Sequence, residues 1–575
     1  MRKHILLVFF LFFNLICYAQ SWLENRTETA QNIVEGEIIA QESFSKNGWI
    51  YTKNSILVNQ TFKGSNLKTV EMISLGGILD NKMTKTSGMM PKIGDVGVFF
   101  AKDGEMLPQS MIKYDRLQKI AISHVGELYK DLGNLYQKLG ANPEKLIQNP
   151  LFYQKPESNK RTEAINIESF FPTSLSAGTR SKITINGSGF GATRGNGNVF
   201  FSDARTGGAT FTQMFSNFGI LPIPRPPIFN NSEPELISWS DTKIEVYVPS
   251  FAGSGEIAVI NDAKELFRTI DKLTVDFSLE TAPANNPNNG VKPAVNADLI
   301  NSNGTGGYTL FVDPQIFQNN VALTALSRGL NNWRCATGIN IELAASQATI
   351  NFGARGISTI IGGGGINNFD VISQYDFCNT GTEQAWRMEE FQIIVNLQQV
   401  QRAGIDLESQ ILHLLGRASQ LGYVNDPKDL MYFQLNAGEQ KRSLSANNTK
   451  ATNFIVNQSL VVNDCGPKPM ILVNSTNCSN SIEKPQARFS SDKTGLCGSG
   501  TIVFKDESKN ASSVLWTFNG GNPATSTARN PKVDYSAAGI YDVQMLATNP
   551  AGTDTGLKKF YIVVGTAGQI KIDLG

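Results

Sequence analysis

Histidine is scarce in this chain: its 575 residues contain only three, His4, His124 and His413. His4 lies in a leader-like N-terminus, so an exported mature chain keeps two, too few for a zinc site of three histidines. Charge is nearly balanced, with 51 Lys and Arg against 50 Asp and Glu. Because no basic stripe stands out, we expect no nucleic-acid binding. Beyond the leader no apolar run is long enough to span a bilayer, so we expect no transmembrane segment.

The first residues predict an exported protein. Arg2 and Lys3 precede an apolar run at residues 5–17, and Ala19 offers a small residue before a cleavage point at Gln20. This pattern is typical of a secretory signal peptide, which we place at residues 1–19. We therefore expect the mature chain outside the cell or at its surface, with the periplasm as the other compartment.

Cysteine is also rare, with five residues beyond the leader. An exported compartment permits disulfides, and Cys335–Cys378 is an expected pair within one domain. Cys478 has two candidate partners, Cys465 and Cys497, and the sequence does not decide between them. No CxxC spacing occurs, so a metal-binding role for these cysteines is not indicated.

The length and the many short apolar runs predict a mostly β protein of roughly three to five domains. Residues 20–110 read as an N-terminal β domain with no visible chemistry. Residues 111–165 read as a helical segment and linker, with Leu128, Leu132, Leu135 and Leu139 on one helix face. His124 lies there apart from any acidic or cysteine cluster, which favours a structural or surface role over a metal-ligand role.

Residues 168–275 carry the turn glycines and the alternating strand of a β-sandwich. The characteristic segments, in chain order, are Phe171-Pro172 with Ser174, Ala177-Gly178-Thr179, residues 183–191, residues 237–244, Val248-Pro249 and Ser254-Gly255. Their order resembles the IPT/TIG family of immunoglobulin-like β-sandwiches. The resemblance implies a spacing or binding role for this domain.

Residues 285–475 alternate strands with helices and contain the most informative helix, at 406–421. Trp333 lies on the apolar stripe of an earlier helix, His413 lies in the middle of the later one, and Met431 follows it. This arrangement resembles the matrixin-like metzincin metalloproteases, whose HExxHxxGxxH motif supplies three zinc ligands and a general base. The resemblance implies one α+β protease-like domain, with His413 at the first ligand position and Met431 at the Met-turn.

The chemistry of that motif is missing here. Leu414 occupies the general-base position, Arg417 and Tyr423 occupy the second and third ligand positions, and Gln420 replaces the helix-breaking glycine. An isobutyl group cannot activate water, and a fixed guanidinium repels a metal cation. We therefore assign no catalytic residue and leave His413 as the sole retained metal-ligand position.

Other interpretations of this region stay open. The helix at 406–421 has an ordinary amphipathic stripe, so simple packing would explain it as well. A carboxylate from Asp426 or Asp429 could be recruited as a replacement ligand. The four glycines at 362–365 suggest a phosphate loop, but no Lys-Ser/Thr follows them, which favours an ordinary loop.

Residues 485–565 contain a second motif-rich β segment, followed by a tail at 566–575. The relevant positions are residues 514–521, Asn530-Pro531, Tyr535, Ala538-Gly539, Tyr541-Asp542-Val543 and residues 549–552. They resemble the PKD family, another β-sandwich, although the acidic residues that would bind calcium after the Trp-x-Phe motif are absent.

Together these patterns predict a secreted or surface multidomain protein related to zinc metalloproteases but catalytically inactive. We expect it to bind a protein or glycan ligand and to carry no cofactor. The alternative is an active zinc endopeptidase with a rearranged site, and only that interpretation requires zinc. A third hypothesis is a purely structural surface protein, and the sequence does not indicate an oligomeric state.

Overall fold

A computed structural model provides the architecture of the chain. It describes residues 22–565 except 87–89, 116–119, 124–127, 143–165, 214–234, 285–291, 345–357, 363–369, 380–383, 462–468, 474–484, 486, 509–510, 512 and 550–551. The signal peptide at 1–19, His124, Cys465, Cys478, most of the glycine run at 362–365 and the tail at 566–575 therefore lie outside the described residues. The prediction of a mostly β, multidomain protein is confirmed.

The N-terminal domain is a small barrel. Its strands are β1 (Asn32–Lys46), β2 (Trp49–Lys63), β3 (Thr69–Leu75), β6 (Val96–Lys102) and β7 (Glu105–Asp115). They pair in the order β3-β2-β1-β6-β7, and β3 also pairs in parallel with β7, which closes the ring. Gly36 in β1 lies where a Cβ would meet the backbone oxygen of Leu57 at 2.3 Å, so the strands approach closely there.

The domain boundary predicted at residue 110 is wrong, and the described residues at the start of the helical segment predicted from residue 111 are strands instead. Residue 110 falls inside β7, and β8 (Ile120–Ser123) and β9 (Leu128–Tyr129) continue the same sheet. Among the described residues of this segment only α3 (Leu132–Lys138) is helical, and its Leu132 and Leu135 pack into the barrel core together with residues of α2 (Trp22–Thr29) and β6. Strand pairing has overridden the local helical spacing.

A hairpin leaves the barrel between β3 and β6. It consists of β4 (Gly77–Leu79) and β5 (Lys82–Thr86), which pair with each other rather than with the barrel sheet. β5 pairs antiparallel with a strand of the central domain, from Ile372 opposite Thr86 to Asp376 opposite Lys82. The N-terminal domain therefore contributes two strands to the sheet of another domain.

The second domain is a β-sandwich. One sheet has the order β10-β12-β16-β15 and the other β14-β13-β17-β18, while β11 and β19 pair in parallel. The strands are β10 (Asn166–Phe171), β11 (Ser174–Ala177), β12 (Lys182–Ser188), β13 (Asn198–Asp203), β14 (Phe211–Gln213), β15 (Leu236–Trp239), β16 (Lys243–Tyr247), β17 (Ala252–Ile260), β18 (Leu266–Arg268) and β19 (Thr274–Ser278). Ile183, Ile185, Ile244 and Val246 face a shared core, as the alternating sequence predicts.

The central domain follows through β20 (Ala282–Ala284) and β21 (Lys292–Val295). Its mixed sheet has the order β24-β23-β25-β27-β26-β5-β4, with β22 beside β27. The strands are β22 (Asp298–Leu299), β23 (Tyr308–Val312), β24 (Ile341–Leu343), β25 (Ser358–Gly362), β26 (Asp370–Asn379) and β27 (Gln384–Val395). The pairs β24–β23, β23–β25 and β25–β27 are parallel, whereas β26 is antiparallel to β27.

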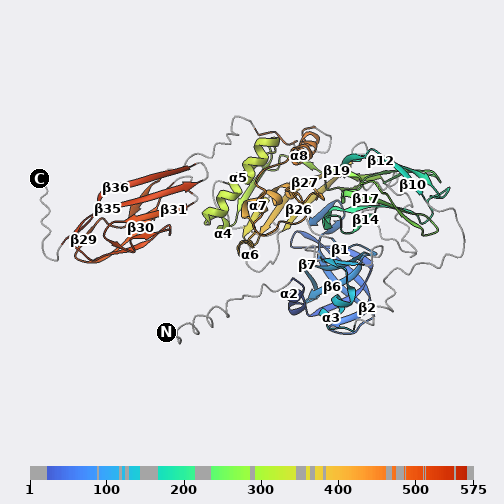
Figure 1. Ribbon diagram of the computed structural model, residues 1–575, viewed down its shortest axis with the longest axis horizontal. Coiled ribbons are helices and arrows are strands. Elements are labelled where there is room, and N and C mark those ends of the chain that lie inside the picture. The colour runs from blue at the N-terminus through green and yellow to red at the C-terminus, as the bar shows by residue number, and fades with distance from the viewer. Residues whose placement is uncertain are drawn as a thin grey trace, which may run out of the picture.

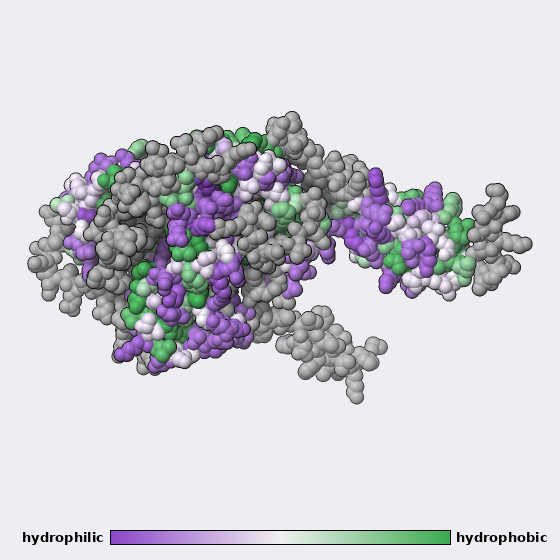
Figure 2. All heavy atoms as spheres, turned by 180° about the vertical axis from the view of Figure 1, so that it is seen from behind, coloured by the Kyte–Doolittle hydropathy of each residue, from purple (hydrophilic) through white to green (hydrophobic). Residues whose placement is uncertain are grey.

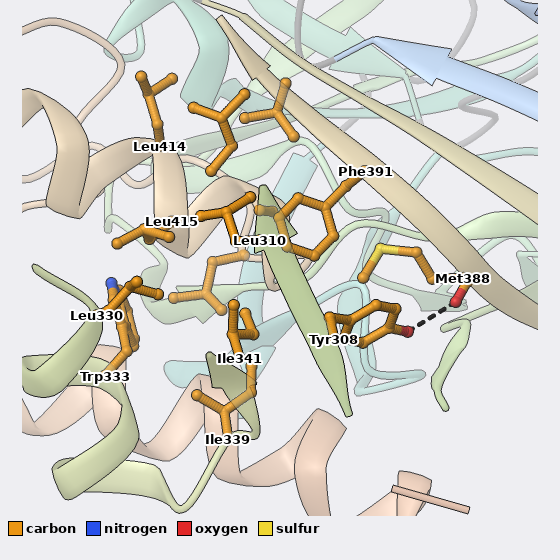
Figure 3. Packing of buried hydrophobic residues seen from close by; sticks show 14 of the residues in the cluster. Tyr308, Leu310, Leu330, Trp333, Ile339, Ile341, Met388, Phe391, Leu414 and Leu415 are labelled. Atoms are coloured by element: carbon orange, nitrogen blue, oxygen red, sulfur yellow. Dashed lines mark hydrogen bonds between the residues drawn. The ribbon is translucent and has the colours of Figure 1, made fainter. Parts of the chain in front are cut away.

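Helices pack on this sheet. They are α4 (Pro314–Phe317), α5 (Asn320–Thr337), α6 (Leu397–Ala403), α7 (Leu407–Ala418) and α8 (Ala446–Ser459). Figure 3 shows Trp333 and Leu330 of α5, Leu415 of α7 and Ile341 of β24 in one hydrophobic core, with the Tyr308 hydroxyl donating to the Met388 carbonyl at 2.7 Å. No helix among the described residues is long and apolar enough to cross a membrane.

The last domain is a second β-sandwich, which lies at one end of the molecule (Figure 1). Its strands are β28 (Phe489–Ser491), β29 (Gly495–Cys497), β30 (Gly500–Asp506), β31 (Ser513–Phe518), β32 (Gly521–Asn522), β33 (Thr525–Ser526), β34 (Lys532–Tyr535), β35 (Gly539–Asn549) and β36 (Gly552–Gly565). Trp516 is fully buried between the sheets β28-β30-β34-β32 and β29-β36-β35-β31-β33. Figure 2 shows hydrophilic and hydrophobic side chains interspersed on its visible face.

Candidate functional site: the buried polar face of helix α7

Helix α7 begins at a well-defined cap and is buried along its length. The Asp406 carboxylate accepts hydrogen bonds from the Ser409 backbone NH at 2.9 Å and hydroxyl at 2.7 Å, which satisfies the first turn. Every residue from Glu408 to Ala418 is buried. The indole of Trp333 donates to the Leu412 carbonyl at 2.9 Å and ties α5 to α7. An amphipathic helix that only packed on a core would leave its polar face exposed. The polar face of α7 is instead buried against other residues.

The helix ends where the family motif has its glycine. Gln420 has a φ of 67°, and the Leu421 NH donates to the Gly416 carbonyl at 3.0 Å, as in a Schellman ending. A glutamine in this conformation is strained relative to glycine. Its side chain compensates, because the amide both accepts from the Ala297 NH at 3.2 Å and donates to the Ala297 carbonyl at 2.9 Å.

His413 points toward the segment that follows the helix. Its Nδ1 lies 2.8 Å from the Leu430 carbonyl oxygen, which can only accept, so Nδ1 carries the hydrogen. Burial lowers the pKa of His413 to about 4, and the nearby Arg417 and Lys441 act in the same direction, whereas the Leu430 hydrogen bond opposes them. The imidazole is therefore neutral at pH 7. Metal-binding histidines commonly hold their second nitrogen in this way.

Met431 packs directly against the same helix. A Cβ placed on Gly416 would lie 2.7 Å from the Met431 sulfur and 2.9 Å from the Trp333 ring. The Met431 NH donates to the Asp429 carboxylate at 2.7 Å, and its carbonyl accepts from the Val424 NH at 3.1 Å. Gly416 thus provides the space in which Met431 sits, one turn from His413.

Tyr423 lies between the other two motif residues. Its ring stacks on the His413 ring with centroids 5.8 Å apart and an interplanar angle of 18°. The Arg417 guanidinium lies over the Tyr423 ring, 4.1 Å from the centroid. The structure therefore brings His413, Tyr423 and Arg417 together as a stack of two rings and a cation.

Arg417 interacts with charged residues from outside the central domain. Its guanidinium forms an ion pair with Glu280, which follows β19, and donates to the Leu421 carbonyl. Glu280 pairs in turn with Lys85 of β5, and Lys85 also donates to the Thr281 carbonyl at 3.3 Å. The side chains of Arg417, Glu280 and Lys85 are 2%, 9% and 14% exposed, so this triad, named here the junction triad, is buried.

The charge state of the junction triad follows from its geometry. Burial alone would raise the pKa of Glu280, but Arg417 and Lys85 outweigh burial and hold that pKa below its usual value. Glu280 is therefore ionised at neutral pH. Sequence reasoning missed Glu280 and Lys85, because both lie far along the chain from the helix and neither belongs to a recognisable motif.

The residues around His413 do not fit a catalytic zinc ion. Leu414 is an apolar side chain with 2% exposure, Arg417 is a cation, and Tyr423 is stacked between the other two. Zinc in proteins takes thiolate, imidazole or carboxylate donors. Among the described residues no three His, Cys, Asp or Glu side chains gather closely enough to hold a metal.

The two carboxylates proposed as replacement ligands have other partners. Asp429 accepts from the Met431 NH, from the Ser445 hydroxyl at 2.8 Å and from the Asn448 amide at 2.8 Å. Asp426 is exposed and accepts from the Lys428 NH at 2.9 Å. Asp429 therefore binds residues at the start of α8, and Asp426 stabilises a turn.

The expected disulfide between Cys335 and Cys378 is not formed. Cys378 at the end of β26 is disulfide-bonded, but the Cys335 sulfur on α5 belongs to no disulfide. The partner of Cys378 lies outside the described residues. Cys497 in the last domain is an exposed thiol. Cysteine spacing gave no basis for choosing among these pairings.

Comparison with known proteins identifies the last domain. Residues 487–559 match the PKD domain family. These residues form a PKD domain. A similar solved structure is the PKD1 domain of the metalloprotease PrtV from Vibrio cholerae, with 34% identity over 15% of this chain and 100% of that chain, and a TM-score of 0.13. No curated protein matches the chain.

Proposed function

We propose that this chain is a catalytically inactive relative of the metzincins that acts as an exported binding or scaffold protein. In this proposal helix α7 no longer performs chemistry and instead joins three domains. The observation that carries the proposal is the junction triad, in which Arg417 at a zinc-ligand position is committed to Glu280 and, through it, to Lys85.

Local geometry supports descent from a metzincin. His413 is oriented by a carbonyl at 2.8 Å, Met431 packs beneath the helix at Gly416, and Gln420 adopts the conformation that glycine prefers. A helix whose only role is packing does not require these three features together. The three features occur at the positions that the resemblance assigns to a zinc ligand, the Met-turn and the helix-ending glycine.

Electrostatics supports the loss of catalysis. A metal at His413 would lie beside the Arg417 guanidinium, and removing that guanidinium from Glu280 would leave a buried carboxylate without its main partner. With Leu414 in place of the general base, no group at this position can activate water. We expect no cofactor in the native protein.

The binding role then belongs to outer surfaces. The β-sandwich that resembles the IPT/TIG family is joined to the central domain by contacts such as the Asn425 amide on the Ser254 carbonyl at 2.8 Å. The PKD domain follows at the end of the chain. We propose a protein or glycan ligand outside the cell or at its surface, and the alternative of an active zinc endopeptidase would require Arg417 to move out of the site.

Hydrogen exchange tests the joining role of α7. In Lys85→Met and Arg417→Met, the backbone amides of β5 and β26 should exchange at least about tenfold faster, since the strand pairing loses a buried ion pair that holds the domains together. Lys46→Met is the matched control, because Lys46 is a half-exposed lysine of the same domain that pairs with Glu105 at the surface. Unchanged exchange in both triad variants would refute the joining role.

A further inference from the structure

Two cations from different domains share one aromatic ring. The ammonium of Lys92, in the segment between β5 and β6, lies 5.6 Å from the centroid of the Phe251 ring. The guanidinium of Arg205, in the turn after β13, lies 4.1 Å from the same centroid. Phe251 and Arg205 belong to the second domain, so this cluster sits where that domain meets the N-terminal barrel.

The neighbouring charges are paired, but Lys92 is not. Asp203 accepts from Arg205 at 3.0 Å and 2.6 Å, and Lys113 pairs with Asp95 at 2.6 Å. Asp95 also accepts from the Lys92 backbone NH at 2.9 Å, which fixes the segment without neutralising the ammonium. Among the described residues no carboxylate lies within ion-pair distance of the Lys92 ammonium, so this group has no partner of opposite charge there.

Donor groups remain available on both cations. Asp203 occupies Nε and Nη2 of Arg205, and Nη1 makes no hydrogen bond with a described residue. The pKa of Lys92 is lowered to about 7, chiefly by burial, with Arg205, Lys113 and Lys85 acting in the same direction and Asp95 opposing them. The Arg205 side chain is 15% exposed and Lys92 is of intermediate burial, so both keep a small area in contact with solvent. Both groups lie over the Phe251 ring and the charge of Arg205 acts on Lys92, so an anion bound beside this ring would relieve the repulsion between the cations.

We propose that Lys92 and Arg205 bind an oxyanion, a sulfate or carboxylate group, at the contact between the barrel and the second domain. Guanidinium and ammonium groups are the usual protein donors to such anions, and the partly buried position strengthens the bond. The group could arrive as a free inorganic ion or on an acidic glycan, which presents the same chemistry. The site is separate from α7 and does not depend on the function proposed above.

The test measures how acetylation of the Lys92 amine depends on pH. The wild-type chain is acetylated across a pH series, and mass spectrometry gives the pH of half-labelling for Lys92 in sodium chloride, in sodium sulfate and in a sulfated oligosaccharide, all at equal ionic strength. A bound oxyanion favours the ammonium, so the half-labelling pH of Lys92 should rise by about one unit. Lys505, an exposed lysine of the PKD domain with 68% side-chain exposure, is the internal reference and should not move.

The relative size of the two shifts distinguishes a free ion from an acidic glycan as the source of the oxyanion. Equal shifts with sulfate and oligosaccharide at matched sulfate concentration indicate a site for the free ion, and a larger shift with the oligosaccharide indicates a glycan. Either result supports the site, provided that Arg205→Met abolishes the shift. If Lys92 and Lys505 respond alike, or if Lys92 does not respond to either compound in the wild-type chain, the proposal is overturned.

Discussion

Arg417 and Glu280 form a buried ion pair that connects helix α7 to the segment leaving the second domain. The pair spans 137 residues of sequence. Lys85 extends it to the N-terminal hairpin, so charges from three domains meet at one carboxylate. A buried pair of this kind does not guarantee net stability, but it is costly to break from one side. The first prediction uses that asymmetry.

Removing either partner should destabilise the protein, and removing both should cost less than the sum. Arg417→Met leaves Glu280 with Lys85 alone, and we expect the free energy of unfolding to fall by about 3 kcal/mol. In the double variant Arg417→Met/Glu280→Gln the loss should be smaller than the summed single losses by at least about 1 kcal/mol. Urea unfolding, followed by tryptophan fluorescence, gives the free energy of unfolding of the wild-type protein, Arg417→Met, Glu280→Gln and the double variant. Strictly additive losses would show that Arg417 and Glu280 are not coupled.

Two helix glycines should respond differently to substitution by alanine. At Gly416 a Cβ would lie 2.7 Å from the Met431 sulfur, whereas at Gly329 of α5 the nearest atom is a Leu415 methyl at 3.2 Å. We expect Gly416→Ala to lower the free energy of unfolding by about 1–3 kcal/mol through overpacking. Gly329→Ala should be neutral or stabilising by up to about 1 kcal/mol, because alanine favours helix. Thermal unfolding of the two alanine variants measures these changes. Similar effects at both sites would contradict tight packing of Met431 against Gly416.

Acid should destabilise the central domain through His413. Its folded pKa is about 4, below the ordinary 6.5, so the folded state binds fewer protons than the unfolded state between these values. Stability is fully present above pH 6.5 and is lost as the pH falls toward 4, by up to about 3 kcal/mol. His413→Gln keeps a neutral polar side chain, and its unfolding free energy should vary less over this window. Urea titrations at several pH values compare the two proteins, and parallel pH profiles would remove His413 as the cause.

Much of the local structure followed from sequence patterns. The helix predicted at 406–421 appears as α7, shortened by the Asp406 cap and the turn at Gln420. The PKD domain was also predicted correctly. These elements were accessible because their signals are local: alternation, amphipathic spacing and motif residues.

The missing parts depended on contacts between distant segments. The leucines at 128, 132, 135 and 139 suggested one helix, but Leu128 lies in β9, because pairing with β8 decides its conformation. Nothing in the sequence around Glu280 or Lys85 indicates that both reach Arg417. The candidate site was therefore located by its motif, whereas the partners that determine its present role became visible only in the folded structure.

The most direct test of the account is the zinc content of the native chain. The purified protein is incubated with zinc, desalted and analysed by plasma mass spectrometry beside His413→Ala and the rebuilt variant Leu414→Glu/Arg417→His/Tyr423→His. The rebuilt variant restores the ligand spacing and serves as the positive control. We predict that the native chain holds less than about a tenth of a zinc ion per molecule, the same as His413→Ala, because one imidazole beside a guanidinium is an insufficient site. One zinc per chain that His413→Ala loses would contradict the account and indicate an active, rearranged metalloprotease site.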